Sequence, residues 1–538
     1  MRKIAPLSAL MLCLSMLGAC GGGGGGSSAP ASNSGGSGSG ITYTPGVFKP
    51  SSTFAAQCAA PRTGNDPSTG SPYPDKPGST VTENNWLRSW SNELYLWYSE
   101  ITDRDPSSYS TTAAYFDVLK TDQLSPTGAP KDKFHFTYST AQWETLSASG
   151  ATPSYGAQWS FISTTPPRQL VVAYVEPNSP AESAGLVRGD QILTVDGVDL
   201  VNANTQADVD KLNAGISPAT SGENHEFLVQ DPGGSNRRFV TLRSADIASA
   251  SVMNVKTVAT ATGNVGYIQF NDHLAGAEKG LYDAINTLKA ANITDLVIDM
   301  RYNGGGYLDI ASELAYMVAG NTSTAGMTFD KTTFNDKYPN TNPVTGATLQ
   351  PESFLTTSQG FGTLASGTAL PSLDLARAFV LTGPDTCSAS EAVINGLRGV
   401  GVEVIQIGQA TCGKPYGFYP QDNCGTTYFS IEFKGENAKG FGDYSDGFMP
   451  VSDTPANDAQ VPGCMVADDF THALGDASEA RLAAALSYRA GTGCPVAATG
   501  RGKMSGAVDL AAASGRLVRS PLFENLILSH ANELRKRR

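Results

Sequence analysis

The stretch DTCSASEAVINGLRGVGVEVIQIGQATCGK, residues 385–414, decides the fold of the region around it. It follows a strand-like run, Ala378–Thr382 (AFVLT). Apolar residues at helical spacing predict an amphipathic helix over residues 391–397. Ser388 is therefore expected on a sharp turn between strand and helix, where unpaired backbone N–H groups favour negative charge.

A second strand, Val402–Ile407 (VEVIQI), leads to Gly413-Lys414 at the end of the same stretch. Parallel strands would carry Ser388 and Lys414 to one edge of a sheet. A serine becomes a nucleophile only if a base takes its proton, and a lysine whose pKa is lowered by desolvation can do this. The alternative is that Ser388 caps a helix and Lys414 is a solvated cation, which is the commoner case for a serine before a helix.

Three sequence blocks together resemble peptidase family S41, the carboxy-terminal processing proteases. The blocks are SASEA at 388–392 followed by GK at 413–414, LVIDMRYNGGG at 296–306, and GYIQF at 266–270. The resemblance implies that Ser388 is the nucleophile, that Lys414 is its base, and that no metal or cofactor takes part.

Strands and helices alternate between residues 248 and 495, which predicts an α/β domain with a largely parallel, covered sheet. The resemblance implies that this domain is ClpP/crotonase-like. Binding sites in such sheets lie at the carboxyl ends of strands, so the Asn303–Gly306 turn and Ser388 are expected to share one cleft. We assign the oxyanion hole to the N–H groups of Ala389 and Gly305.

Two residues are candidates for accessory roles in this site. His273 follows the first strand, and a Ser–His mechanism is the rival to Ser–Lys because some relatives of the family use histidine. Gln421 is a possible orienting group for the lysine, although its spacing departs from the family pattern. Asp299 is interpreted as a buried partner of the backbone or of Arg301.

Residues 151–247 resemble a PDZ domain of the bacterial protease type, on SPAESAGL at 179–186 and GDQILTVDG at 189–197. Tyr155-Gly156-Ala157 occupies the position where such domains hold a peptide's terminal carboxylate. The peptide would add as a strand beside Trp159-Ser160-Phe161. The alternative is that the module only packs against the catalytic domain.

Residues 53–150 are predicted to form a small helical N-terminal domain, with a first helix capped by Thr82 and a second over residues 109–120. One helical face is expected to carry an aromatic stripe made of Trp86, Trp90, Leu94, Trp97 and Ile101. This stripe is interpreted as core. A strand is predicted at residues 134–138, with His135 structural.

The amino-terminal residues predict that the protein is located in the cell envelope of a bacterium. Residues 1–19 have the charged and apolar parts of a signal peptide, and LGAC at 17–20 resembles a lipobox, which implies lipidation of Cys20. An ordinary secretory peptide is the alternative. Residues 20–52 are predicted to be a flexible, Gly/Ser-rich linker. No aspartate directly follows Cys20, and by resemblance to the sorting rules of bacterial lipoproteins this favours the outer membrane. The protein would there face the periplasm or the cell surface.

The net charge and the cysteine content exclude further classes of partner and site. The formal net charge is −13, which argues against a nucleic-acid partner. Six cysteines lie beyond the lipobox, and in an oxidising compartment they are expected to form disulfides, with Cys412–Cys424 and Cys464–Cys494 as plausible local pairs. A metal site is disfavoured, because no C-x-x-C occurs and histidines number five.

The sequence thus predicts a multidomain serine endopeptidase of the carboxy-terminal processing type, followed by a tail at residues 496–538. Its expected partners are protein or peptide substrates and, through the lipid anchor, a membrane. The alternative is a catalytically inactive, surface-tethered PDZ scaffold. The intact pair of Ser388 and Lys414 argues against that alternative.

Overall fold

The computed structural model describes residues 42–67, 69–149, 151–495 and 527–528. The predicted signal peptide, Cys20 and most of the tail lie outside these residues. In the described part of the chain, no helix is both long and apolar enough to cross a membrane.

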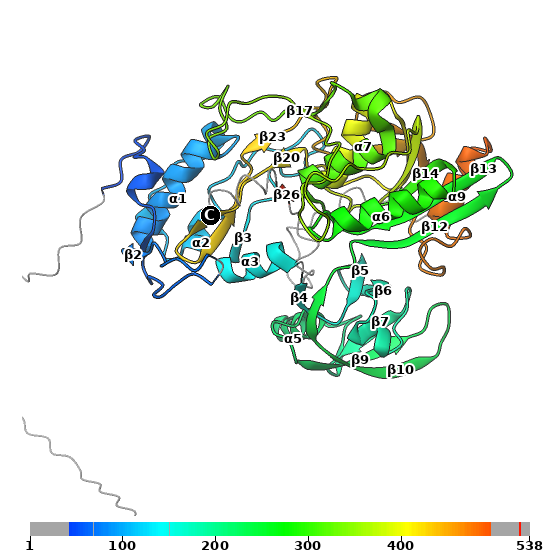
Figure 1. The fold of residues 1–538 in the computed structure, drawn as a ribbon. Helices are drawn as coiled ribbons and strands as arrows, with labels where there is room; N and C mark the ends of the chain where they lie inside the picture. Colours follow the sequence, from blue (N-terminus) through cyan, green and yellow to red (C-terminus); the bar gives the residue numbers. More distant parts are fainter. Residues whose placement is uncertain (1–41, 68, 150, 496–526, 529–538) are drawn as a thin grey trace, which may run out of the picture. The chain divides into compact units, whose positions relative to one another are not determined.

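The α/β domain is built on a seven-stranded sheet in the order β12-β13-β14-β18-β19-β25-β24. Its strands β12, β13 and β14 are labelled in Figure 1. In chain order the strands are β12 (Val252–Thr260), β13 (Gly263–Phe270), β14 (Ile293–Asp299), β18 (Arg377–Thr382), β19 (Glu403–Gly408), β24 (Met449–Val451) and β25 (Gln460–Met465). All neighbouring strands are parallel except β12, which runs antiparallel to β13. The predicted parallel sheet is confirmed, while strands β12, β24 and β25 were not predicted.

Both faces of this sheet are covered by helices. Ile298 points to a cluster shared with α6 (Ala277–Ala290), α7 (Leu308–Thr324) and α8 (Ala389–Gly399). Its neighbour Val297 points to the other face, which packs against α9 (Ala480–Arg489). Because successive strand residues are buried on opposite faces, these strands read as continuous apolar runs. The carboxyl ends of β14, β18 and β19 are thereby held in a rigid, two-sided core.

The PDZ-like domain has a sheet in the order β10-β9-β7-β6-β5, with β8 paired to β7 (Figure 1). Its elements are β5 (Ala157–Ser163), β6 (Gln169–Val175), α4 (Pro180–Ser183), β7 (Gln191–Val195), β8 (Val198–Asp199), α5 (Gln206–Ile216), β9 (Asn224–Gln230) and β10 (Arg237–Arg243). Strand β5 lies at the end of this order. It therefore presents an edge to which an extended peptide can add.

The N-terminal region differs in detail from its prediction. Helix α1 (Thr80–Leu94) is capped by Ser79, whose hydroxyl accepts a hydrogen bond from the Thr82 amide, so the predicted cap at Thr82 is wrong. Trp97 lies beyond the end of α1, because the chain turns at Tyr95 into η2 (Tyr98–Glu100). The second helix is short, with α2 spanning Thr112–Phe116. The region also contains η1 (Ser51–Thr53), β1 (Gln57–Cys58), β2 (Lys76–Pro77), η3 (Pro106–Ser108), β3 (Phe136–Ser139) and α3 (Thr140–Ser149).

The N-terminal region is joined to the α/β domain by strand pairing and aromatic packing. Strand β3 pairs with β22 (Thr426–Phe429), which pairs with β21 (Gln421–Asn423). The rings of Trp86 and Trp90 stack on each other with centroids 5.3 Å apart, and both lie against Tyr428 of β22. Trp86 and Trp90 of the predicted stripe are therefore core, whereas Trp97 and Ile101 lie beyond the helix and are partly buried in a different cluster.

Short strands complete the fold. They are β4 (Ala151–Ser154), β11 (Ala245–Ala248), β15 (Gly306–Tyr307), β16 (Thr328–Asp330), β17 (Glu352–Ser353), β20 (Tyr416–Gly417), β23 (Phe433–Lys434) and β26 (Ile527–Leu528). Strand β26 runs parallel to β15, directly after the glycine turn.

Three disulfides form among the described residues, and only one of them matches the predicted pairing. Cys464–Cys494 is confirmed. The predicted Cys412–Cys424 bond is wrong, because Cys412 lies opposite Cys387 with Cα atoms 5.1 Å apart. Cys424 instead bonds Cys58, which is 366 residues away in the chain.

Candidate active site

Ser388 occupies a strained turn between β18 and α8. Its backbone has φ 65° and ψ −117°, a conformation that residues other than glycine rarely adopt. The residue is 1% exposed, and among the described residues its hydroxyl has no hydrogen-bond partner. The hydroxyl therefore does not cap α8, which removes the main argument for a purely structural serine.

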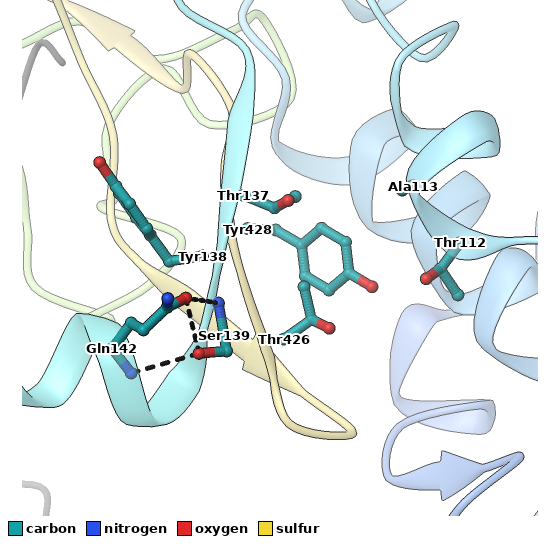
Figure 2. A pocket seen from close by; sticks show the side chains of 8 residues that line it. All are labelled: Thr112, Ala113, Thr137, Tyr138, Ser139, Gln142, Thr426 and Tyr428. Atoms are coloured by element: carbon teal, nitrogen blue, oxygen red, sulfur yellow. Dashed lines mark hydrogen bonds between the residues drawn. The ribbon is translucent and has the colours of Figure 1, made fainter. Parts of the chain in front are cut away.

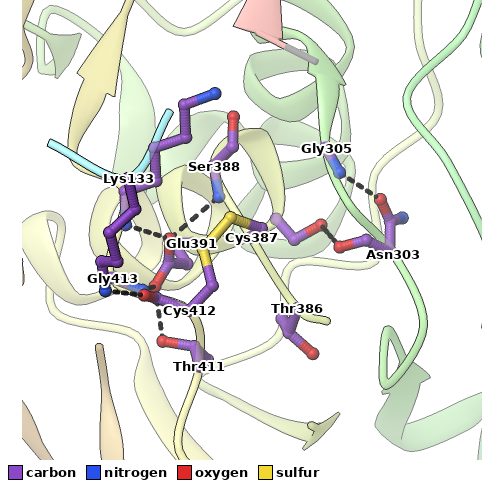
Figure 3. Close-up of a disulfide and its surroundings, with 12 residues drawn as sticks. Lys133, Asn303, Gly305, Thr386, Cys387, Ser388, Glu391, Thr411, Cys412 and Gly413 are labelled. Carbon is purple, nitrogen blue, oxygen red and sulfur yellow. Dashed lines mark hydrogen bonds between the residues drawn. A yellow bond between two sulfur atoms is a disulfide. The ribbon is translucent and has the colours of Figure 1, made fainter. Parts of the chain in front are cut away.

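The carboxylate of Glu391 connects this turn to the loop that carries Lys414 (Figure 3). Its Oε2 atom accepts hydrogen bonds from the amides of Ser388 and Lys414, at 2.9 and 2.8 Å. Its Oε1 atom accepts from the Gly413 amide at 2.9 Å and from the Thr411 hydroxyl. Burial raises the pKa of Glu391, and these hydrogen bonds oppose the rise. One side chain thus fixes the backbone positions of Ser388 and of Lys414.

A covalent link runs alongside these hydrogen bonds. The Cys387–Cys412 disulfide joins the residue before Ser388 to a residue two positions before Lys414 (Figure 3). The two sulfurs and Glu391 also form a group with the spacing of a metal site. Because the sulfurs are bonded to each other, they are not available as thiolate ligands.

The side chain of Lys414 is buried, with 1% exposure. Its Nζ atom lies 4.3 Å from the ring centroid of Phe418 and 4.9 Å from that of Phe134. Burial lowers the pKa of Lys414 well below its usual value, and the carboxylates of Asp132 and Glu391 oppose this only in part. A lysine in this environment can be neutral near pH 7 and accept a proton.

The glycine turn after β14 lies against the serine. A methyl group on Gly305, whose φ is 101°, would sit 2.9 Å from Ser388 Oγ. Asn303 ties the two turns together, because its carbonyl accepts from the Cys387 amide at 3.0 Å. The Asn303 side chain accepts from the Gly305 amide at 2.9 Å (Figure 3). The two turns are therefore adjacent, as predicted from their places after β14 and β18.

The geometry of the two turns shows whether the Ala389 and Gly305 amides, assigned to the oxyanion hole, are available to donate. The Ala389 N–H is at the start of α8, where amides have no partner within the helix. The Gly305 N–H is occupied by Asn303, so it can serve an oxyanion only if that bond is exchanged. Ala389 is the better placed of the two predicted donors.

His273 is a structural part of the glycine turn. It is fully buried, its amide donates to the Gly305 carbonyl at 3.0 Å, and its Nδ1 atom lies 3.1 Å from Asn303 Oδ1. Burial lowers its pKa to about 3. Neither its Nε2 atom nor Ser388 Oγ has a hydrogen-bond partner in the described part of the chain, so the two are not bonded to each other.

Gln421 lies on β21, where its backbone is paired with Tyr428. Its Nε2 atom donates to the Asp422 carbonyl at 3.4 Å. The predicted orienting role is therefore not visible in its described contacts. His135, predicted to be structural, is buried, and one ring nitrogen lies 2.8 Å from the Phe116 carbonyl oxygen.

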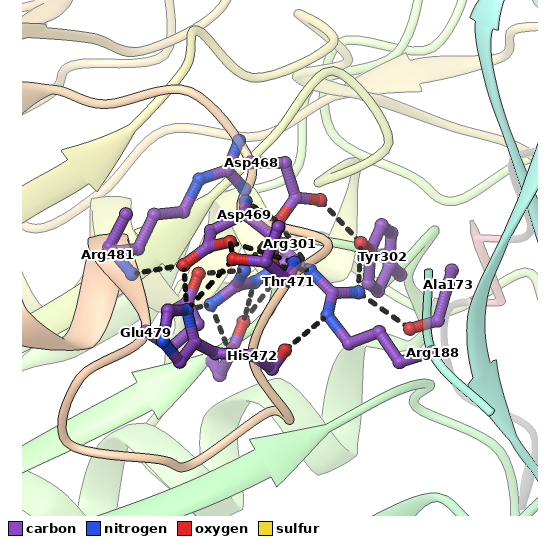
Figure 4. Close-up of polar contacts among 12 residues, drawn as sticks. Ala173, Arg188, Arg301, Tyr302, Asp468, Asp469, Thr471, His472, Glu479 and Arg481 are labelled. Carbon is purple, nitrogen blue, oxygen red and sulfur yellow. Dashed lines mark hydrogen bonds and ion pairs between the residues drawn. The ribbon is translucent and has the colours of Figure 1, made fainter. Parts of the chain in front are cut away.

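A buried ion network lies behind the glycine turn (Figure 4). Arg301 donates to Asp299, Asp468 and Glu479 at 2.6–3.0 Å. Arg188 of the PDZ-like domain donates to Asp468 at 2.7 Å and to the Tyr302 hydroxyl at 2.8 Å. The interpretation of Asp299 as the partner of Arg301 is confirmed.

The predicted peptide-binding loop of the PDZ-like domain leads into the edge strand β5. Tyr155 is buried, and its hydroxyl donates to the Gly215 carbonyl at the end of α5, at 2.7 Å. Gly156 has φ 75°, and a methyl group there would collide with the Ser179 side chain at 2.2 Å. Ala157 begins β5. The predicted loop is thus tied to the end of α5 and continues directly into the edge strand β5.

A separate cavity of about 240 Å³ lies between α2 and the paired strands β3 and β22 (Figure 2). Hydroxyl and amide groups dominate its lining, among them Thr112, Ser139, Gln142 and Tyr428. None of the residues discussed above as catalytic lines it. No acidic, basic or thiol side chain is among its lining residues, so none of its hydroxyls has a general base beside it in this lining.

Sequence reasoning missed the two rings that enclose Lys414. Phe134 was interpreted only as part of a strand, and Phe418 was not singled out. Glu391 was expected to begin the helix, without a role at the site. The only available signal was the acidic residue three positions after the helix cap, the spacing of a capping box.

Three segments of the chain match models of known domains. Residues 264–417 match peptidase family S41, residues 171–240 match a PDZ domain, and residues 82–139 match the peptidase S41 N-terminal domain. Ser388, Lys414, Ala389, Gly305 and His273 lie in the first of these segments, and Gln421 lies just beyond its end.

The chain is similar to carboxyl-terminal processing proteases. It is 30% identical to one from Picosynechococcus sp. over 139 residues, which are 26% of this chain and 32% of that protein. It is 26% identical to the carboxy-terminal processing protease CtpB of Bacillus subtilis over 148 residues, 27% of this chain and 29% of that protein. The matched segment spans about a third of the length of these relatives.

The fold is also found among solved structures. An S41 protease from Bacteroides fragilis superposes with a TM-score of 0.57 and 22% identity, covering 78% of this chain and 98% of that one. The chain is therefore multidomain, with an N-terminal domain, a PDZ domain and an α/β domain that match those of S41 peptidases.

Proposed function

We propose that this protein is a serine endopeptidase of the carboxy-terminal processing type, with Ser388 as nucleophile and Lys414 as general base. The observation that carries the proposal is the shared oxygen of Glu391, which binds the amides of both residues. The buried Lys414 and the Ser388 hydroxyl, which has no hydrogen-bond partner among the described residues, are thereby held close to each other. This is the arrangement that a serine needs to lose its proton.

The proposed reaction has two halves. Neutral Lys414 takes the proton from Ser388 Oγ as that oxygen attacks the peptide carbonyl carbon, and the ammonium then protonates the leaving amine. The Ala389 N–H stabilises the oxyanion, and such a donor lowers the barrier by about 2.7–4 kcal/mol. Water, deprotonated by the same lysine, releases the acyl group from Ser388.

The proposed substrates are proteins or peptides, some of them held by the PDZ domain. The edge of β5 and the loop at Tyr155-Gly156-Ala157 would receive an extended carboxyl-terminal segment. The names of the similar proteins support cleavage near carboxyl termini. An inactive scaffold would not need Lys414 buried, because an unused cation is more stable in water.

Proteolysis of a fluorescently labelled casein, together with labelling of the serine by a fluorophosphonate, tests the proposal. The wild-type protein should digest casein and accept the label, and Ser388→Ala should do neither. Lys414→Ala should reduce both rates by about 10²–10⁴-fold, the usual contribution of a general base. If the wild-type protein takes no label and cleaves nothing, the proposal is wrong.

The rival base is tested with His273→Asn, which retains a side-chain nitrogen near Asn303. This variant should keep both rates near those of the wild type. Loss of labelling in folded His273→Asn, together with full labelling in Lys414→Ala, would show that histidine is the base.

We also propose that the protein is anchored to the bacterial outer membrane through lipid on Cys20. The proposal is supported by the LGAC sequence at residues 17–20. Cells fed an alkyne-tagged palmitate should label the wild-type protein and leave Cys20→Ser unlabelled. A wild-type protein that is unlabelled and recovered only in the soluble fraction would contradict the anchor.

A further inference from the structure

The pocket around Lys414 is completed by a segment that belongs to another domain. Phe134 lies within the residues that match the N-terminal domain model, 280 positions before Lys414. Its ring is 3% exposed and faces the Lys414 Nζ atom at 4.9 Å. The second ring, that of Phe418, comes from the α/β domain. One wall of the lysine pocket is therefore supplied by the N-terminal domain.

Neighbouring residues of the same segment hold this wall in place. The Lys133 Nζ atom donates to the Cys412 carbonyl at 3.2 Å. Phe134 packs in a cluster with Tyr95, Ile431 and the half-cystine Cys387. The segment thus contacts both ends of the disulfide that links the nucleophile turn to the lysine loop.

Asp132 places a buried negative charge beside this pocket. Its Oδ1 atom accepts from the Phe134 amide at 2.9 Å, and its Oδ2 atom accepts from the Tyr95 hydroxyl at 2.8 Å. The residue is 4% exposed, so its field is weakly screened. The same carboxylate and that of Glu391 act on the charge of Lys414.

Two other ionisable groups of the segment can be set aside. The pKa of His135, whose Nδ1 atom is 3.8 Å from Asp132, is lowered by burial to about 4, so its ring is neutral at pH 7. The Lys133 ammonium lies 5.7 Å from the Phe134 ring and is bonded to a carbonyl.

We propose that Phe134 and Asp132 are positioning residues of the Ser388–Lys414 site, through which the N-terminal domain sets the protonation state of the catalytic lysine. The inference depends on the proposed peptidase activity. Phe134 excludes water and so favours the neutral amine, whereas Asp132 favours the ammonium. The two residues therefore act in opposite directions.

Because the two residues act in opposite directions, their substitution should shift the activity–pH profile in opposite directions. Phe134→Ala would admit water, raise the pKa of Lys414 and move the acid limb of the activity–pH profile upward. Asp132→Asn would remove a negative charge, lower the pKa of Lys414 and move that limb downward. In Asp132→Asn the side-chain amide can still pair with the Tyr95 hydroxyl, because a hydroxyl can also accept a hydrogen bond.

The assay is the rate of fluorophosphonate labelling of Ser388 in the full-length protein as a function of pH, which requires no knowledge of the natural substrate. In Phe134→Ala we expect the acid limb of the labelling-rate profile to shift upward by about one pH unit. At pH values below that limb, labelling should be about tenfold slower than in the wild type. In Asp132→Asn we expect the limb to fall by about half a unit.

The matched control is Phe54→Ala, the same change at a residue of the N-terminal region that is 5% exposed. It should lower thermal stability without moving the limb. Phe134→Leu, which keeps an apolar side chain, should restore most of the shift and serves if Phe134→Ala does not fold.

Folded variants whose limb coincides with that of the wild type would overturn the inference, even if their maximal rates fall. A shift of the same sign in both variants would overturn it as well. Failure of the peptidase proposal looks different, because the wild-type protein itself would then take no label.

Discussion

Replacing Lys414 by methionine should inactivate the protein and at the same time stabilise its fold. Methionine has nearly the length of lysine and no charge, and its thioether packs well against rings such as those of Phe134 and Phe418. In the wild-type protein the buried amine must be deprotonated or desolvated when the chain folds. That penalty disappears in Lys414→Met.

The size of the effect follows from proton linkage. The unfolded lysine has a pKa of 10.5, and burial lowers the value in the folded state. At pH 7, keeping the amine neutral therefore opposes folding by at most about 5 kcal/mol, since each pH unit corresponds to about 1.36 kcal/mol. Contacts of the amine reduce this penalty, so we expect Lys414→Met to be more stable by about 2–4 kcal/mol.

The sign of the pH dependence is also fixed. A lysine with a lowered pKa in the folded state binds fewer protons there, so the stability of the wild-type protein rises as pH increases toward the unfolded pKa. The advantage of Lys414→Met should be larger at neutral pH than at higher pH, and it should shrink as pH rises toward 10.5. Urea denaturation at several pH values, with the disulfides intact, measures it directly.

Lys434→Met is the control, because the Lys434 side chain is 45% exposed and pairs with Glu436 on the surface. Its stability should stay within about 0.5 kcal/mol of the wild type at all pH values. Lys414→Met that is less stable than the wild type near neutral pH, or whose advantage does not change with pH, would refute the reasoning. Lys414 would then not be held neutral by burial, and its role as base would lose its physical basis.

Three further predictions concern the turns around the nucleophile. Glu391→Gln replaces an oxygen that accepts from two amides by a group that donates at one end, so we expect about 2–4 kcal/mol lower stability and little serine labelling; an unchanged melting temperature would contradict it. Gly305→Ala would place a methyl group 2.9 Å from Ser388 Oγ and from the Cys387 carbonyl. Labelling should fall by about 100-fold with circular dichroism unchanged, and a loss of less than about twofold would show that the two turns are not in contact. Ser388→Gly should be more stable than Ser388→Ala by about 1 kcal/mol in denaturation, because only glycine adopts φ 65° and ψ −117° without strain; equal stabilities would show that the turn is relaxed.

The α/β core could be predicted from sequence because its signals are local. The runs that became β13, β14, β18 and β19 are apolar throughout, and the helices between them have clear periodicity. Their alternation specified a parallel sheet, and the rule that sites lie at strand ends brought Gly305 and Ser388 together. Strands β24 and β25 were missed because they are short or contain proline and glycine.

The surroundings of the lysine could not be predicted in this way. Phe134 and Phe418 meet at Lys414 from different domains, and nothing in the local pattern of either residue indicates that contact. The same holds for Cys58 and Cys424, which come together where the N-terminal region packs against β22. Cys412 and Cys424 are close in sequence, which favoured a bond between them. In the fold, each of the two bonds a different cysteine.

The Cys58–Cys424 bond matters for anyone who wishes to produce a shortened form of this protein. A fragment beginning at residue 248 would keep Cys424 and lose the cysteine that bonds it, leaving a lone thiol free to crosslink fragments. The same fragment would expose the face of β22 on which Trp86 and Trp90 stack. Recombinant work on this protein should therefore start upstream of Cys58, and peptide mapping under non-reducing conditions offers a simple check that each preparation is correctly crosslinked.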